Sequence, residues 1–351
     1  DNGIKVFEPS GRKLDDAMER LIESDIQSQT ENPESPAHVR EARPKNSDRS
    51  EELRTQYINY LTHEIGHDLL LSNLRIVVDC ANGAACEIAP EVLRRLSAKV
   101  IAINNTPDGR NINLNAGSLH IESLQAHVVA ERAHLGVAFD GDADRALFVD
   151  ASGKFVDGDA TLWVLANYLK ARGELTRDKV VATVMSNIGL EIALRSQGID
   201  LVRTDVGDKY VLEELLRSGT ALGGEQSGHI IFPKVSLAGD GIVTTLMLLR
   251  AIVEKQQSLA ELTQGIQRYP QVLVNVRVRE KLPFEDLPSV QRLAREIERS
   301  LGDRGRLLLR YSGTEALARV MIEGPTESEV NQNAQNLAAA IQKEIGASSD
   351  S

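Results

Sequence analysis

The stretch "GVAFDGDADRALFVD", residues 136–150, places a short acidic loop between two apolar runs. Each apolar run is typical of a buried strand. Loops that follow buried strands are where open α/β sheets bind their ligands. The loop contains three aspartates at every second position, Asp140, Asp142 and Asp144, followed by Arg145. Like charges this close repel unless a cation or a proton joins them, so the stretch predicts an α/β sheet and a bound partner.

Strand-like and helix-like segments alternate around this stretch, from about residue 50 to about residue 255. Such alternation is typical of βαβ units. Near residue 268 the order changes to strand, helix, two strands and a last helix, which indicates an α+β unit. The sequence therefore predicts a multidomain α/β fold, with mostly parallel or mixed sheets flanked by helices and a smaller C-terminal α+β domain.

Composition and missing motifs argue against several classes of function. A formal charge of −11 argues against a nucleic-acid or anionic-membrane partner. No apolar run approaches the roughly 18 residues of a membrane span. Cys80 and Cys86 lack metal or redox spacing, so we expect reduced thiols in a cytoplasmic protein. The dinucleotide motif G-x-G-x-x-G and the P-loop motif are both missing from the sequence, so neither a dinucleotide enzyme nor a P-loop ATPase is supported.

The acidic loop has three interpretations. An EF-hand would need glycine and glutamate where Arg145 and Ala151 stand, so that interpretation fails. A solvated acidic turn is the second. Three hard oxygen donors with room for further oxygens suit Mg²⁺, which often shares its ligand shell with a phosphate, and Arg145 could bind the same anion.

A second polar stretch, "GGEQSGH", spans residues 223–229. Glu225 and Ser227 stand between glycines that let the backbone approach a ligand closely. A carboxylate and a hydroxyl suit a polyol, because each sugar hydroxyl both donates and accepts hydrogen bonds. The alternative is a polar turn that leads into an apolar strand. His229 fits either a substrate ligand or a satisfied interior histidine.

A third stretch, "RYSGTEALARVMIEG", spans residues 310–324. Guanidinium groups, hydroxyls and a flexible amide gather in one turn and the strand after it: Arg310, Ser312, Gly313, Thr314 and Arg319. This mixture suits a dianionic phosphate. An ordinary S-G-T hairpin is the alternative.

The stretch "HEIGH", residues 63–67, matches the zinc-peptidase motif H-E-x-x-H. The extended form of that motif fails, because Asn73 stands where its third histidine belongs. Glu87 is a poor third ligand, since it follows a strand and turn rather than lying on a facing helix. We therefore do not expect a zinc peptidase.

Taken together, the motifs resemble the α-D-phosphohexomutase family, most closely its bacterial glucosamine branch. The resemblance covers nearly the whole chain and rests on seven motifs in order: "DNGIK", "VDCANGAA", "FDGDADR", "VMSNIGLE", "VGDKYV", "GEQSGH" and "RYSGTEALARVMIEG". "RTDVGDKYV" and the S-G-T form of the last loop favour the glucosamine branch. A phosphomannomutase or phosphoglucomutase of the same family remains the alternative.

The resemblance implies three similar α/β domains and a smaller C-terminal phosphate-binding domain around a central cleft. In this chain we expect residues 1–52 to be the remnant of domain 1 and a linker. Residues 53–155 would form domain 2 with the metal loop, 156–267 domain 3 with the sugar loop, and 268–351 the C-terminal α+β domain.

The resemblance also implies an isomerase that interconverts glucosamine 6-phosphate and glucosamine 1-phosphate, for UDP-N-acetylglucosamine and cell-wall precursor synthesis. In the family a phosphoserine gives its phosphoryl group to the bound monophosphate. The resulting sugar bisphosphate, which is the intermediate and activator, turns around and returns its other phosphate to the serine. The implied cofactor is Mg²⁺, the implied partner is a small phosphosugar, and we expect a monomer or homodimer.

Roles follow residue by residue from the resemblance. The three aspartates would hold Mg²⁺, with Arg145 beside the transferred group. Glu225, Ser227 and His229 would contact the sugar, and Lys209 would contact substrate. Lys5 is a candidate for acid–base or electrostatic help. The phosphate that does not react would be held by Arg310, Ser312, Gly313, Thr314 and Arg319.

Two departures from the family pattern matter. The family's Ser-His-Asn-Pro loop occurs nowhere in the 351 residues, and Ser10, in "EPSG", does not match it. We expect the serine to lie upstream of residue 1 and this chain to be inactive alone; a truncated, non-catalytic phosphosugar-binding protein is the alternative. Ala316 stands where the family usually has proline, which removes no phosphate donor.

Overall fold

The computed structural model describes residues 6, 8–11, 14, 16–31, 47–313 and 315–347. The chain forms two compact units. Unit 1 comprises Asp1–Val184 and Val202–Gln264, and unit 2 comprises Met185–Leu201 and Gly265–Ser351. Within the described part, none of the helices has the length and apolar character needed to cross a bilayer.

Unit 1 contains a five-stranded mixed sheet with the order β2-β1-β3-β4-β5. Strand β1 runs parallel to both β2 and β3, whereas β4 and β5 continue the sheet antiparallel. β3 and β4 are buried along their whole length, which explains their unbroken apolar sequences. The strands are β1 (Arg75–Asp79), β2 (Lys99–Ile103), β3 (Leu135–Phe139), β4 (Ala146–Asp150) and β5 (Phe155–Val156).

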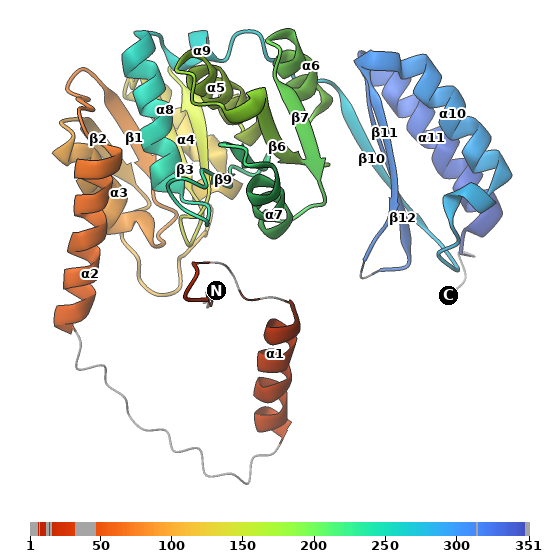
Figure 1. The fold of residues 1–351 in the computed structure, drawn as a ribbon, viewed down its shortest axis with the longest axis horizontal. Coiled ribbons are helices and arrows are strands. Elements are labelled where there is room, and N and C mark those ends of the chain that lie inside the picture. The colour runs from red at the N-terminus through yellow and green to blue at the C-terminus, as the bar shows by residue number, and fades with distance from the viewer. Residues whose placement is uncertain are drawn as a thin grey trace. The chain divides into compact units, whose positions relative to one another are not determined.

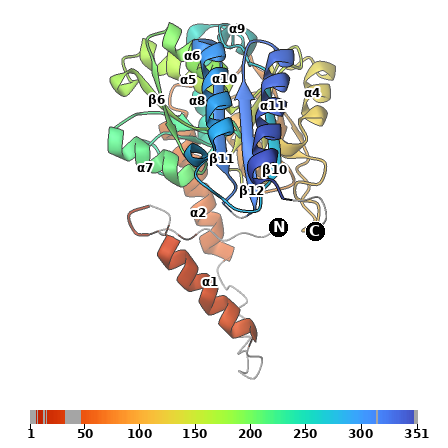
Figure 2. The same cartoon turned by 90° about the vertical axis from the view of Figure 1, so that its right-hand side faces the viewer.

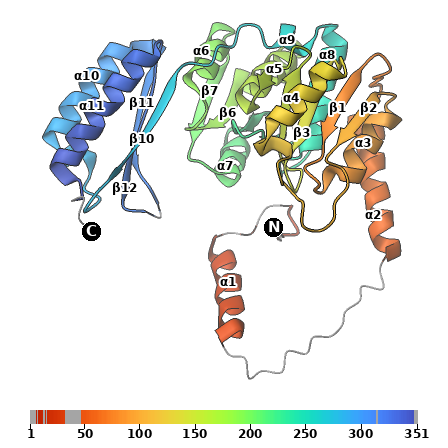
Figure 3. The same ribbon diagram turned by 180° about the vertical axis from the view of Figure 1, so that it is seen from behind.

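Helices cover both faces of this sheet. Helix α4 (Ile121–Ala130) lies on the near side in Figure 3, and α8 (Gly241–Lys255) on the near side in Figure 1. Leu124 and Val128 of α4 are fully buried against Val77 and Val149. α3 (Ala85–Arg95) packs beside β2. The acidic loop connects the antiparallel strands β3 and β4, so it is a hairpin turn at the end of two buried strands.

A second sheet has four strands in the order β7-β6-β8-β9. β6 and β8 are parallel, and β8 and β9 are antiparallel. The strands are β6 (Lys179–Thr183), β7 (Asp200–Thr204), β8 (Gly223–Gly224) and β9 (Ile230–Ile231). The helices that accompany it are α5 (Gly158–Ala171), α7 (Asp208–Ser218) and α9 (Leu259–Leu262). The predicted sugar loop is the turn between β8 and β9.

The first helices are α1 (Asp16–Glu31) and α2 (Ser47–Tyr60), and α2 continues into a π-helix, η1 (Leu61–Ile65). Four apolar residues of α1 are exposed: Met18, Leu21, Ile22 and Ile26. Short 3-10 helices are η2 (Gly117–Leu119), η3 (Thr176–Asp178), η4 (Phe284–Asp286) and η5 (Gly302–Arg304).

Unit 2 is an antiparallel sheet of β10 (Gln271–Arg277), β12 (Leu317–Glu323) and β11 (Arg306–Tyr311), in that order. Helices α10 (Pro288–Leu301) and α11 (Glu327–Ile345) lie side by side over one face, as Figure 2 shows. Val320 and Ile322 are fully buried beneath them. Because strand side chains alternate, Arg319 lies on the helix-free face.

Helix α6 (Ile188–Ser196) is part of unit 2, and a buried carboxylate joins its N-terminus to the sheet of that unit. Glu323, at the end of β12, is fully buried and accepts hydrogen bonds from Asn187 Nδ2 and Ile188 N, at 3.1 and 3.2 Å. Arg306 Nε donates to the same carboxylate at 2.9 Å. This pairing satisfies a charge that would otherwise be costly to bury.

The predicted fold class is confirmed: a multidomain α/β chain with mixed sheets and a C-terminal α+β part. The last helix expected after residue 268 is α11. The four-part domain division stays a prediction.

Candidate active site

The acidic loop brings its three carboxylates together. One ligand oxygen from each of Asp140, Asp142 and Asp144 lies within 4.8 Å of the others. Ala143 adopts a left-handed conformation (φ 62°), and its amide donates to the Asp140 carbonyl at 3.2 Å. Within the described residues, no other group of three histidine, cysteine or acidic side chains converges in this way.

Three carboxylates crowd this loop, and Arg145 forms only long ion pairs with two of them. Burial, and then the neighbouring Asp144 carboxylate, raise the pKa of Asp140 to about 7. The amide of Arg145 donates to Asp140 Oδ1 at 3.1 Å, which acts in the opposite direction. The Arg145 Nε atom stays 3.8 Å from Asp140 and 3.7 Å from Asp144, beyond hydrogen-bond range. A divalent cation would relieve the repulsion, so the donor set fits Mg²⁺.

The sugar loop forms a closed turn in which the Gly228 amide donates to the Glu225 carbonyl at 3.0 Å. Glu225 Oε1 accepts from Gly207 N at 3.2 Å, and Oε2 accepts from Ser227 Oγ at 3.3 Å. Gly207 precedes α7, whose first turn carries Lys209. The structure thus brings the segment containing Lys209 to the loop containing Glu225 and Ser227.

The acidic loop and the sugar loop are joined through their backbones. The amide of Ala146, at the start of β4, donates to the Gly228 carbonyl at 3.1 Å. Gly228 has a φ of +90°, and a Cβ there would lie 2.5 Å from the Ala146 carbonyl oxygen. Only glycine permits this approach, so the glycine of the sugar loop sets its distance from the metal loop.

His229 lies between these loops and α7, with 4 % of its surface exposed. Its Nδ1 is 3.5 Å from Asp144 Oδ2, and its Nε2 is 3.6 Å from Asp208 Oδ2. The ring therefore links the metal loop to the segment beside Lys209 from inside the protein. Direct contact between His229 and a sugar stays a prediction.

The phosphate loop is the hairpin between β11 and β12. Arg310 pairs directly opposite Arg319 in the antiparallel register. Like charges in this position destabilise a sheet unless an anion lies between them. Arg319 Nη2 is 3.3 Å from Ser312 Oγ, while its buried Nε has no hydrogen-bond partner among the residues that the structure describes. The turn also contains Gly313; Thr314 and Lys5 lie outside the described residues.

Sequence reasoning missed Lys281, which stands outside every recognised motif. Its Nζ donates to the Ser312 carbonyl at 2.6 Å, so a further cation adjoins the phosphate loop. Phe284 stacks on Tyr311 with ring centroids 4.3 Å apart, and Tyr311 donates to the Leu282 carbonyl at 2.6 Å. These contacts hold the segment that carries Lys281 against β11.

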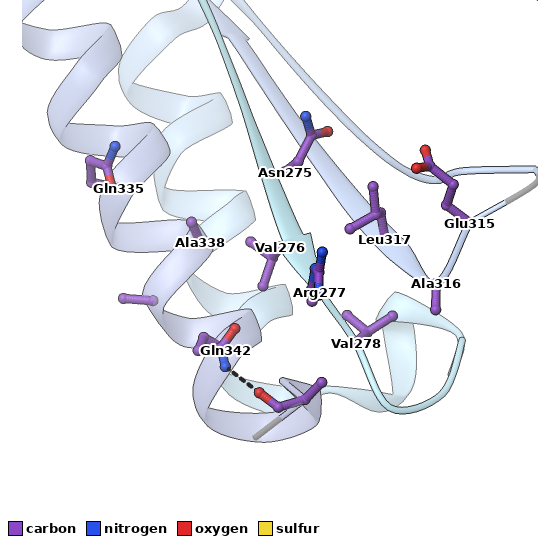
Figure 4. A pocket seen from close by; sticks show the side chains of 12 residues that line it. Asn275, Val276, Arg277, Val278, Glu315, Ala316, Leu317, Gln335, Ala338 and Gln342 are labelled. Atoms are coloured by element: carbon purple, nitrogen blue, oxygen red, sulfur yellow. Dashed lines mark hydrogen bonds between the residues drawn. The ribbon is translucent and has the colours of Figure 1, made fainter. Parts of the chain in front are cut away.

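A groove of about 780 Å³ lies between the edge strand β10 and α11, as Figure 4 shows. Its walls include Asn275, Arg277, Glu315, Gln335 and Gln342. None of the predicted site residues lines it. The groove therefore adjoins the phosphate hairpin at Glu315 and Ala316 without including the predicted phosphate ligands.

The zinc-peptidase motif does not adopt the geometry that its chemistry needs. His63 lies in the π-helix η1, where its Nδ1 is 3.1 Å from the Asn59 carbonyl. The helix ends at Gly66, so His67 lies beyond it and pairs with Asp68 at 2.8 Å. The two histidines thus do not share consecutive turns of an α-helix, as a zinc site of this kind requires.

Comparisons with known proteins identify the family. Family models described as phosphoglucomutase/phosphomannomutase match three segments: alpha/beta/alpha domain II at residues 55–153, alpha/beta/alpha domain III at 157–269, and the C-terminal domain at 273–340. A phosphoglucosamine mutase of Solibacter usitatus is 50 % identical over 99 % of this chain and 76 % of its own length. A phosphoglucosamine mutase of Desulfovibrio desulfuricans is 45 % identical over 98 % of this chain and 76 % of its own length.

Solved structures share the fold at lower identity. A phosphoglucomutase/phosphomannomutase family protein of Burkholderia thailandensis matches with a TM-score of 0.67 and 22 % identity, covering 84 % of this chain and 66 % of its own. An Aspergillus fumigatus N-acetylphosphoglucosamine mutase, solved with GlcNAc-6P and magnesium, matches with a TM-score of 0.65 and 21 % identity, covering 83 % and 66 %. The chain spans about two thirds of the length of these solved proteins.

The fold and these matches define a phosphohexomutase. The chain belongs to the phosphoglucomutase/phosphomannomutase family, in its phosphoglucosamine mutase branch. The family resemblance and the expectation of an isomerase of the mutase type are confirmed.

Proposed function

We propose that this chain supplies the metal, sugar and phosphate loops of a phosphoglucosamine mutase, which interconverts glucosamine 6-phosphate and glucosamine 1-phosphate through a sugar bisphosphate. The observation that carries the proposal is the convergence of Asp140, Asp142 and Asp144 beside the sugar loop. We further propose the domain division at residues 52, 155 and 267, a cytoplasmic location and a monomeric or homodimeric state.

Asp140, Asp142 and Asp144 would hold Mg²⁺, which when bound would neutralise charge on phosphoryl oxygens. Arg145, 42 % exposed at its side chain, would face the same anion from the edge of the loop. Glu225 would accept hydrogen bonds from sugar hydroxyls in either orientation of the ring.

In unit 2, Arg319 Nε and the Arg310 guanidinium would donate to the phosphate that does not react. Ser312 and Gly313 would add a hydroxyl and an amide, and Thr314 is proposed for the same role by family resemblance. Lys281 would strengthen the positive potential of this turn, because its ammonium group lies against Ser312.

Calorimetry with three sugar phosphates tests the specificity. With Mg²⁺ present, glucosamine 6-phosphate is expected to bind this chain about 10-fold more tightly than glucose 6-phosphate or mannose 6-phosphate, since one good charge-assisted hydrogen bond is worth roughly that factor. Glu225→Gln should weaken binding of glucosamine 6-phosphate but leave inorganic phosphate unaffected. Equal affinity for all three sugars would contradict the glucosamine assignment.

The pKa of Asp140 predicts how Mg²⁺ binding depends on pH. Because that pKa is raised from 3.8 to about 7, the metal-free loop holds a proton at pH 6 that Mg²⁺ must displace. Mg²⁺ affinity should therefore rise as the pH rises through about 7. Because the pKa of Asp140 is raised on folding, the folded metal-free chain binds this proton more tightly than the unfolded chain does. The stability of the metal-free chain should therefore fall as the pH rises from about 4 to about 7.

Calorimetry in buffers of different ionisation enthalpy counts the protons released. We expect about one proton per Mg²⁺ near pH 6 and almost none near pH 8.5. A proton count that stays at zero across this range would show that Asp140 is already ionised in the metal-free protein.

A further inference from the structure

A part-buried hydroxyl of helix α2 reaches Asp240, the residue that precedes α8. Tyr57 Oη donates to Asp240 Oδ2 at 2.5 Å, across 183 residues of sequence. Burial, and then the adjacent Asp240 carboxylate, raise the pKa of Tyr57 above its usual range. The hydroxyl therefore stays protonated and remains a hydrogen-bond donor at every physiological pH.

The Asp240 carboxylate also caps helix α8. Its Oδ1 accepts hydrogen bonds from the amides of Ile242 and Val243, both at 2.9 Å. One carboxylate oxygen is thus committed to the helix and the other to Tyr57. Both contacts restrain the rotation of the Asp240 side chain, and with it the first turn of α8.

The first turn of α8 holds the acidic loop. The amide of Gly241 donates to the Ala143 carbonyl at 2.9 Å. A Cβ on Gly241 would lie 2.6 Å from the Arg145 carbonyl oxygen, so the two backbones are in direct contact. Ala143 is the residue between Asp142 and Asp144, and its left-handed conformation is unfavourable for alanine. The bond from Gly241 helps to maintain that conformation.

We propose that Tyr57 and Asp240 are positioning residues for the metal loop. They would fix the first turn of α8, and through it Ala143, so that the three aspartates are already converged when Mg²⁺ arrives. This inference rests on the proposed Mg²⁺ site. Neither residue touches the metal: Tyr57 acts through Asp240, and Asp240 through the backbone of Gly241.

The test compares two tyrosines of the same helix. Tyr57→Phe removes the hydroxyl that reaches Asp240, while Tyr60→Phe removes one that donates to the Val235 carbonyl at 3.4 Å. Calorimetric titration of the whole chain with MgCl₂ alone is expected to show about 10-fold weaker binding for Tyr57→Phe, a size typical of lost outer-shell contacts. Tyr60→Phe is expected to stay within about 2-fold of the parent chain on the same basis.

A second variant tests the same contact independently, so that a folding defect of the first variant does not decide the result. Asp240→Asn keeps one oxygen to cap α8 but lacks the carboxylate charge, and it should weaken Mg²⁺ binding to a similar extent. Because the two residues act as a unit, the double variant should be no weaker than the worse single variant. The titrations are run at 10 °C, well below unfolding, so that a merely structural role would lower the melting temperature without changing Mg²⁺ affinity.

The outcomes separate the two claims. If the parent chain binds Mg²⁺ and Tyr57→Phe and Asp240→Asn bind it equally well, the positioning role is overturned and the metal site stands. If the parent chain does not bind Mg²⁺ at all, the proposed metal site fails, and the positioning role fails with it.

Discussion

Replacing Asp142 by asparagine is expected to weaken Mg²⁺ binding by about 100-fold or more. Losing an outer-shell contact typically lowers metal affinity by about 10- to 100-fold, and losing a direct ligand should lower it at least as much. Asp142 is the exposed member of the three, so its side chain contributes little to packing. Removing one of three crowded carboxylates also reduces repulsion in the metal-free protein. The variant should therefore lose the metal without losing stability.

Calorimetry and thermal unfolding, each with and without MgCl₂, measure both effects. The matched control is Asp200→Asn, which neutralises an exposed carboxylate at the start of β7. The parent chain and the control should gain melting temperature with Mg²⁺, and Asp142→Asn should not. An unchanged Mg²⁺ affinity in Asp142→Asn would show that the acidic loop is a solvated turn.

Replacing Arg319 by glutamine is expected to weaken binding of inorganic phosphate and of sugar phosphates by about 10- to 100-fold, the usual worth of a charge-assisted hydrogen bond. Its buried Nε has no partner within the described part of the chain, and Arg310 stands directly opposite. Removing one of two opposed cations relieves repulsion, and this gain offsets the loss of the exposed Arg319–Glu315 ion pair at 3.3 Å. The ligand-free protein should thus be at least as stable as the parent.

Phosphate titration of the parent chain, Arg319→Gln and Arg304→Gln measures this effect. Arg304 is an exposed arginine of unit 2 in η5, outside the hairpin, so its replacement controls for the loss of one positive charge. If both variants lose affinity equally, phosphate responds only to net charge, and the hairpin is not its site.

The sequence predicted the elements whose pattern is local. Strands β3 and β4 are continuous apolar runs because both faces are buried, and composition alone indicates this. Alternation of such runs with helical periodicity predicted the α/β class. The acidic loop was predicted as a site because its charges are adjacent in sequence, so their repulsion requires no tertiary contact to infer.

Other elements left no local signal. β8 is the pair Gly223–Gly224, which has no strand propensity and is a strand only because it pairs with β6 and β9. The π-helix η1 interrupts a segment that a helical period describes equally well. Both depend on neighbours that are distant in sequence.

The same division holds for the site. By itself, the sequence determined which side chains carry charge and hydroxyl groups, and that three loops hold them, since these properties reside in consecutive residues. Only the tertiary structure decided that Ala146 bonds to Gly228, that Lys281 adjoins Ser312, and that Tyr57 reaches Asp240. Such contacts form between residues far apart along the chain, and their geometry depends on how whole strands and helices pack.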